Sequence, residues 1–102
     1  MVKIGGKKVR ILKQVLDITD RKTYQLPGDD IKILSIKEQD GNLVMYFETD
    51  ATADEIIDRK PLTDVTVCVA GTGHERFDLE EMDYVDTVMS SYGLVWHCYV
   101  LY

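Results

Sequence analysis

The chain has few of the histidine and cysteine residues that are common in metal and catalytic sites, and it has no long apolar run. Its 102 residues include only two histidines, two cysteines, two prolines and one tryptophan. No apolar run approaches the roughly 20 residues that a helix needs to cross a bilayer. The first residues also lack the continuous apolar stretch of a signal peptide. The composition therefore predicts a soluble, cytoplasmic protein with no membrane partner.

The two cysteines, Cys68 and Cys98, lie in apolar segments of β-rich composition. No Cys-x-x-Cys pair is present, and neither histidine stands at zinc-finger spacing from them. We expect two buried thiols that pack as small apolar side chains, with a disulfide as the alternative. The sequence predicts no metal site and no cofactor.

No set of residues in the sequence matches a catalytic motif. His74 and His97 do not share the i, i+4 spacing of metal ligands on a helix, and no motif places the many carboxylates. The glycine patterns of phosphate-binding loops and of dinucleotide-binding folds are absent. Catalytic residues assemble in space rather than in sequence, so an enzyme stays possible, but the sequence favours a binding protein.

Charge is unevenly distributed along a chain whose net charge is −6. Residues 1–26 carry seven basic against two acidic side chains, and residues 27–102 carry five basic against sixteen acidic ones. An acidic body disfavours direct nucleic-acid binding, which requires positive charge along the contact. The acidic stretch 75–86 fits either a solvated face or a surface for a basic partner protein. The candidate partner-binding residues there are Glu75, Asp78, Glu80, Glu81 and Asp83.

Length and hydrophobic pattern predict a single, mainly β domain over residues 1–102, with residues 1–10 as a basic N-terminal arm. We expect six or seven antiparallel strands in a small sandwich or barrel-like arrangement, with one or two short helices. The expected strands cover residues 9–16, 23–26, 31–38, 43–48, 63–70, 84–89 and 94–102. The expected helices cover residues 53–57, where a charged loop is the alternative, and 80–82.

Two hairpins are predicted from turn residues and alternation. Asp40-Gly41 between two β-rich runs is typical of a type I′ turn, which needs positive φ at both central residues. Leu43, Met45 and Phe47 should then share one face of their strand. The second hairpin should close around residues 90–93, with Trp96 and Cys98 on one face of the last strand and His97 on the other.

The segment Gly71-Thr72-Gly73-His74 follows the strand expected over residues 63–70 and is the first candidate ligand site. Two glycines let backbone N–H groups turn toward one point and approach an anion closely, and Thr72 and His74 could add donors. The alternative is a tight turn that needs positive φ. The second candidate is Trp96-His97, where aromatic faces could stack on a planar ring such as a purine. The alternative there is core packing for Trp96 and a hydrogen-bonded role on the sheet face for His97.

Several short elements together resemble a family of small proteins of unknown function encoded by bacteriophages and prophages. The resemblance spans about residues 11–99, and Gly-Thr-Gly-His and Val-Trp-His are its most recognisable parts. The matching elements are Tyr24-Gln25-Leu26-Pro27, Ile33-Leu34-Ser35-Ile36, Gln39, Gly41-Asn42-Leu43, Gly71-Thr72-Gly73-His74, Asp86-Thr87-Val88 and Val95-Trp96-His97. The chain departs from the family in its basic residues 1–10 and in Val44-Met45-Tyr46, where a tryptophan-containing strand is expected.

The resemblance implies a phage protein in the bacterial host cytoplasm, and we expect an accessory protein that counters host defence. Three functions are compatible with the residues. The first is sequestration of a phosphorylated or nucleotide immune signal by Gly71, Thr72, Gly73, His74, Trp96 and His97, in a homo-oligomer whose pocket lies between subunits. The second is inhibition of a bacterial defence complex, of the CRISPR or restriction type, through the acidic surface. The third is a structural or regulatory phage component without a ligand.

Overall fold

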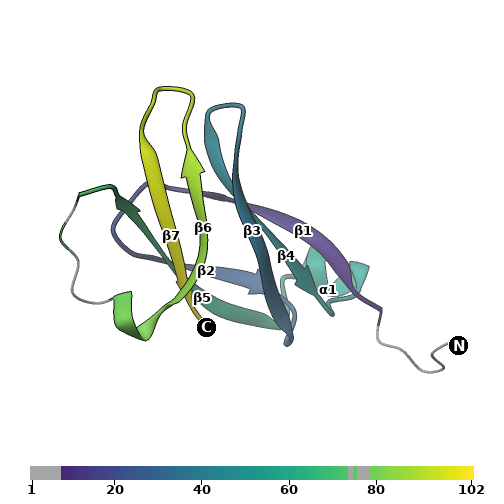
Figure 1. Cartoon of the computed structure of the whole chain (residues 1–102). Coiled ribbons are helices and arrows are strands. Elements are labelled where there is room, and N and C mark those ends of the chain that lie inside the picture. Colours follow the sequence, from purple (N-terminus) through teal and green to yellow (C-terminus); the bar gives the residue numbers. More distant parts are fainter. Residues whose placement is uncertain (1–7, 74, 76–78) are drawn as a thin grey trace, which may run out of the picture.

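A computed structural model describes residues 8–73, 75 and 79–102, which form seven strands, one α-helix and one turn of 3₁₀ helix (Figure 1). The mainly β fold expected from the sequence is confirmed. The strands are β1 (Arg10–Leu16), β2 (Lys22–Pro27), β3 (Ile31–Gln39), β4 (Asn42–Thr49), β5 (Leu62–Gly71), β6 (Asp83–Met89) and β7 (Val95–Leu101). The helices are α1 (Ala53–Asp58) and the 3₁₀ turn η1 (Leu79–Glu81).

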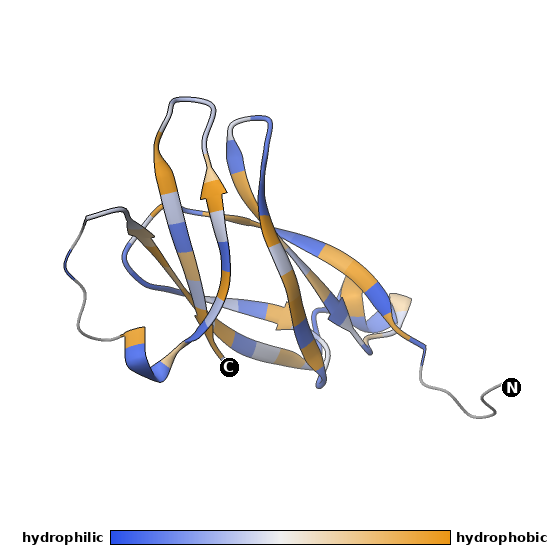
Figure 2. Ribbon diagram, viewed as in Figure 1, coloured by the Kyte–Doolittle hydropathy of each residue, from blue (hydrophilic) through white to orange (hydrophobic). Residues whose placement is uncertain are grey.

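The strands form two antiparallel sheets around one hydrophobic core. One sheet has three strands in the order β1-β4-β3, and the other has four in the order β2-β5-β7-β6. Residues of both sheets contribute to a single buried cluster. As predicted, Leu43, Met45 and Phe47 all point into this cluster, each at most 3% exposed. The alternation of apolar and polar residues along the strands is visible in Figure 2.

The β3–β4 hairpin turns through Asp40 and Gly41, as the sequence predicts. Their φ angles are 52° and 84°, both positive, as a type I′ turn requires. Glycine adopts this conformation without steric cost, and aspartate tolerates it better than most residues do. The turn therefore sets the register in which Gln39 pairs with Asn42.

Helix α1 begins where the sequence predicts and is fixed by a capping box. The hydroxyl of Thr52 accepts from the Glu55 backbone N–H, and the Glu55 carboxylate accepts from the Thr52 N–H. The helix ends at Asp58, and Arg59 caps it in the left-handed conformation with φ 54°. The chain stops being helical two residues before Pro61, so the left-handed cap ends the helix before the proline is reached.

Strands β3 and β6 bring the edges of the two sheets together, and side chains rather than a backbone ladder join them. The Asp86 carboxylate accepts from the Ile36 backbone N–H at 3.3 Å and pairs with Lys37 at 3.1 Å. Farther along, the Glu38 carboxylate accepts from both the N–H and the hydroxyl of Ser91, at 2.8 and 2.9 Å. The two hairpins are thus tied together near their tips.

The cysteines are buried free thiols, as expected, and the disulfide alternative is wrong. In the β5–β7 register Cys68 lies opposite Tyr99 and Cys98 opposite Val69, which puts the two thiols on opposite faces of the sheet. Burial, followed by the nearby Asp86 and Cys68, raises the pKa of the Cys98 thiol from 9.0 to about 12. Cys98 is therefore protonated and unreactive at neutral pH.

No helix in the described part of the chain is long and apolar enough to cross a membrane.

Candidate functional site

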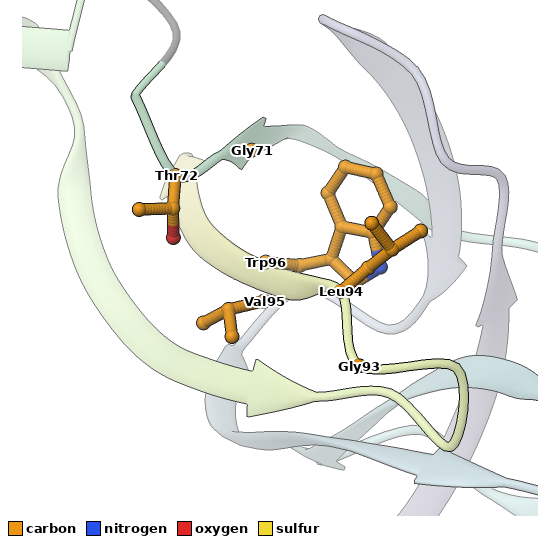
Figure 3. A pocket seen from close by; sticks show the side chains of 6 residues that line it. All are labelled: Gly71, Thr72, Gly93, Leu94, Val95 and Trp96. Atoms are coloured by element: carbon orange, nitrogen blue, oxygen red, sulfur yellow. The ribbon is translucent and has the colours of Figure 1, made fainter.

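A pocket of about 370 Å³ opens at the end of the four-stranded sheet, where β5 leaves it and β7 enters it (Figure 3). It unites three of the predicted ligand-binding residues, Gly71, Thr72 and Trp96, from two segments far apart in the sequence. The remaining lining residues are Gly93, Leu94 and Val95. The lining formed by these described residues is mostly apolar and contains no charged side chain.

The pairing of β5 with β7 creates the space for this pocket. Gly71 is the cross-strand partner of Trp96, so the position facing the indole on β5 has no side chain. The Thr72 N–H donates to the Val95 carbonyl at 3.3 Å and keeps the two strands together one residue farther on. A glycine opposite a large aromatic residue in a sheet is a place where a ligand can approach the backbone.

The turn between β6 and β7 forms another wall of the pocket. The Ser90 N–H donates to the Leu94 carbonyl at 2.8 Å, and the Gly93 N–H donates to the Ser90 carbonyl at 3.1 Å. Gly93 has a φ of 82°, which explains glycine at this position. The predicted closing hairpin around residues 90–93 is confirmed. Glu38 holds this turn from β3 through Ser91.

Trp96 supplies the aromatic surface of the pocket. Its indole is partly buried and packs against the core, so the core-packing interpretation holds for part of the ring. In Figure 3 the ring lies beside the Leu94 side chain, while Thr72 and Val95 point to the other side of β7. Within the described residues the indole N–H has no hydrogen-bond partner, and no buried side-chain nitrogen there lacks one. This N–H therefore reaches solvent and is available as a donor.

His97 lies on the other face of β7 and is engaged by two hydroxyl groups. Its Nε2 is 2.8 Å from the Thr72 hydroxyl, and its Nδ1 is 3.1 Å from the Thr87 hydroxyl. The Thr87 hydroxyl is in turn hydrogen-bonded to Tyr84. Strand alternation separates His97 from the Trp96 ring, so the two neighbours do not form one stacking surface. The geometry matches the hydrogen-bonded role on the sheet face.

The predicted anion site at residues 71–74 is only partly built for that role. Gly73 has a φ of 85° with open space around its Cα, which is the geometry of the tight-turn interpretation. The N–H and the hydroxyl of Thr72 are both used within the chain, by Val95 and His97. These groups would have to exchange partners before they could bind a phosphate. His74 lies outside the described residues.

Gly93, Leu94 and Val95 line the pocket but are not among the ligand-binding residues predicted from the sequence. Their contribution depends on the pairing of β5 with β7, which brings residues 71–72 beside residues 93–96. One local signal pointed to this part of the site: Gly93 ends the predicted turn and directly precedes the expected strand over residues 94–102, which contains Trp96. The exposed Leu94 and Tyr92, 55% and 86% accessible, are further apolar groups at this hairpin tip.

The acidic residues proposed for partner binding are exposed along η1 and the start of β6. Glu75, Glu80, Glu81 and Asp83 are all solvent-accessible, and Asp78 lies outside the described residues. Glu80, Glu81 and Asp83 lie in η1 and at the start of β6, at the end of that strand away from the β6–β7 turn that borders the pocket. Glu75 comes three residues after the pocket residue Thr72. Among the described residues there is no cluster of His, Cys, Asp and Glu that could hold a metal ion.

Comparison with known proteins gives a family but no activity. No curated protein and no solved structure matches the chain. Residues 7–102 match a family described as a domain of unknown function, DUF7352. The match includes all seven strands, the pocket and the acidic surface. Because it covers nearly the whole sequence, the chain belongs to the DUF7352 family.

Proposed function

We propose that this domain is a non-enzymatic binding protein that takes a small ligand with a planar ring, such as a nucleotide base, into the pocket beside Trp96. The observation that carries the proposal is the cross-strand pair of Gly71 and Trp96, which leaves an aromatic face next to an empty position. A ring stacked on such a face gains roughly 1–3 kcal/mol per base. The solvent-facing indole N–H adds one directional hydrogen bond.

The ring is better supported than the phosphate as the recognised part of the ligand. No basic side chain among the described residues lines the pocket, and the polar groups of Thr72 already have partners. A phosphate would therefore extend toward solvent or toward a second subunit. In the phage setting that the family resemblance implies, the biological role would be sequestration of a nucleotide immune signal in the host cytoplasm.

The test is native mass spectrometry of the full chain after incubation with a small-molecule extract of bacteria. We expect a discrete added mass of a few hundred daltons, as expected for one nucleotide-sized ligand. Gly71→Val should abolish the added mass, because its branched side chain would project toward the indole. Gly71 does not have a positive φ, so this change avoids the backbone strain that Gly73→Val would cause.

Thr66→Val, on the same strand and outside the pocket, is the matched control and should keep the added mass. No added mass on the wild-type protein, or equal added mass on Gly71→Val, would contradict ligand binding in this pocket.

A second candidate is an inhibitor that docks a basic groove of a bacterial defence complex. Three exposed acidic residues on the neighbouring elements η1 and β6, Glu80, Glu81 and Asp83, favour it specifically. Electrostatic complementarity of this kind mainly accelerates association, and salt weakens it strongly. Reversal of Glu80, Glu81 and Asp83 to Lys should abolish inhibition and spare ligand binding, whereas Gly71→Val should do the opposite.

A further inference from the structure

The described strands form two sheets with four edges, and three of these edges are protected against pairing with another chain. The edges of β3 and β6 face each other and are joined through Asp86 and Glu38. The edge of β2 is covered by Arg59, whose guanidinium donates to the Gln25 carbonyl at 3.0 Å. Strand β2 also ends in Pro27, which has no N–H to offer a neighbouring strand. Soluble proteins protect their sheet edges by such devices.

The fourth edge, β1, is open and apolar. Among the described residues, β4 is its only strand neighbour, and the only side chain that donates to its backbone is its own Gln14, to Val15 at 2.9 Å. On its outer face Ile11 and Val15 are 62% and 51% exposed, and Val9, just before the strand, is 53% exposed. Lys13 between them is the only charged residue on this face. An exposed apolar edge strand is a template for another strand.

We propose that β1 pairs antiparallel with β1 of a second copy across a two-fold axis, so that two three-stranded sheets become one sheet of six strands. Centring the pairing on Leu12 places Val9 opposite Val15 and Ile11 opposite Lys13. Apolar side chains then meet across the axis, and no two like charges face each other directly. The contact is isologous, as in most protein dimers, and it closes without further growth.

The charges that flank β1 select a second copy in this orientation. The basic residues Lys3, Lys7 and Lys8 precede the strand in the sequence, whereas the residues that follow it carry both signs and begin with Asp17. Asp17 also pairs with Lys22 of its own chain. Antiparallel pairing brings Lys8 of one copy beside Leu16 and Asp17 of the other. Parallel pairing would set the basic ends side by side. The antiparallel orientation therefore keeps the two basic ends apart.

The proposal is tested by sedimentation of the full chain over a concentration series. The wild-type protein should sediment as a dimer, and Ile11→Lys should sediment as a monomer with an unchanged circular dichroism spectrum. Ile57→Lys is the matched control, because Ile57 is 77% exposed on α1, and this variant should stay dimeric. A monomeric wild type, or a dimer that Ile11→Lys leaves intact, would overturn the proposal.

Cysteine cross-linking tests the register, because the native thiols are buried. The double variant with Val9→Cys and Val15→Cys should form a covalent dimer on oxidation, since these positions face each other in the proposed pairing. Neither single variant should do so. Covalent dimers of Val15→Cys alone would overturn the pairing centred on Leu12.

Discussion

The two hairpins whose tips lie together at one end of the molecule are built for different purposes (Figure 1). The β3–β4 hairpin closes through a two-residue turn, its strands carry charges of both signs, and its inner face contributes Leu43, Met45 and Phe47 to the core. In the β6–β7 hairpin no Asp, Glu, Lys or Arg follows Asp86. Its wider turn exposes Tyr92 and forms a wall of the pocket. The second hairpin also contributes Val88, Cys98 and Val100 to the core, so the two hairpins differ at their tips, where only the second presents a surface for contact.

The largest expected effect comes from truncating one large apolar side chain in each hairpin. Phe47→Ala should lower the free energy of unfolding by about 3–5 kcal/mol, because Phe47 is 2% exposed and its removal leaves a cavity. Leu94→Ala, at a side chain 55% exposed, should change it by no more than about 0.5 kcal/mol. Urea unfolding followed by circular dichroism measures both. Equal losses would show that the exposed turn of the second hairpin contributes as much to stability as the core face of the first.

A second test measures how the buried Cys98 on the core side of β7, rather than the exposed turn before this strand, affects the pH dependence of stability. The Cys98 thiol has a pKa of about 12 in the folded protein and of 9.0 in the unfolded chain, so the unfolded chain loses this proton at a lower pH. The contribution of this thiol to the free energy of unfolding is therefore fully present below pH 9. It declines between pH 9 and 12, by up to about 1.4 kcal/mol per pH unit. Cys98→Ala should have a shallower decline than the wild type in urea unfolding above pH 9. Identical slopes would mean that the thiol is not shielded.

The smallest effect, and the sharpest comparison, is a matched pair of glycine substitutions in the two turns. Gly41 and Gly93 have nearly equal φ angles, 84° and 82°, and an added methyl group would meet no atom within 4 Å at either. Gly41→Ala and Gly93→Ala should therefore each cost about 1–2 kcal/mol through backbone strain alone. Only Gly93→Ala should shift the fluorescence of Trp96, because only that turn borders the pocket. A fluorescence shift in Gly41→Ala would contradict the conclusion that only the β6–β7 turn borders the pocket.

The first hairpin was predictable from sequence because its determinants are local. Asp40-Gly41 fixes the turn, and the alternation of faces along the strand places Leu43, Met45 and Phe47 on the core face. The capping box of α1 is equally local, since Thr52 and Glu55 are three residues apart. Patterns of this length can be interpreted without knowledge of the rest of the fold.

The pocket was predictable only in part because it depends on which strands pair. Local composition indicated Gly71, Thr72 and Trp96, but the register of β5 against β7 decides that Gly71 faces the indole. The same register adds Leu94 and moves His97 to the opposite face, where Thr72 and Thr87 bind it. The join between β3 and β6 gave no sequence signal, since a carboxylate bound to a distant backbone N–H resembles any other surface aspartate.

The most direct test of ligand binding at this pocket is the NMR signal of the Trp96 indole N–H, which is unique because the chain has one tryptophan. Adenosine and adenosine monophosphate are suitable probes, titrated into the wild-type protein and into Gly71→Val. The proposed function predicts a saturable shift of this signal with both probes in the wild type, and none in Gly71→Val. An indole signal that neither probe moves in the wild type, or that moves equally in Gly71→Val, would contradict it.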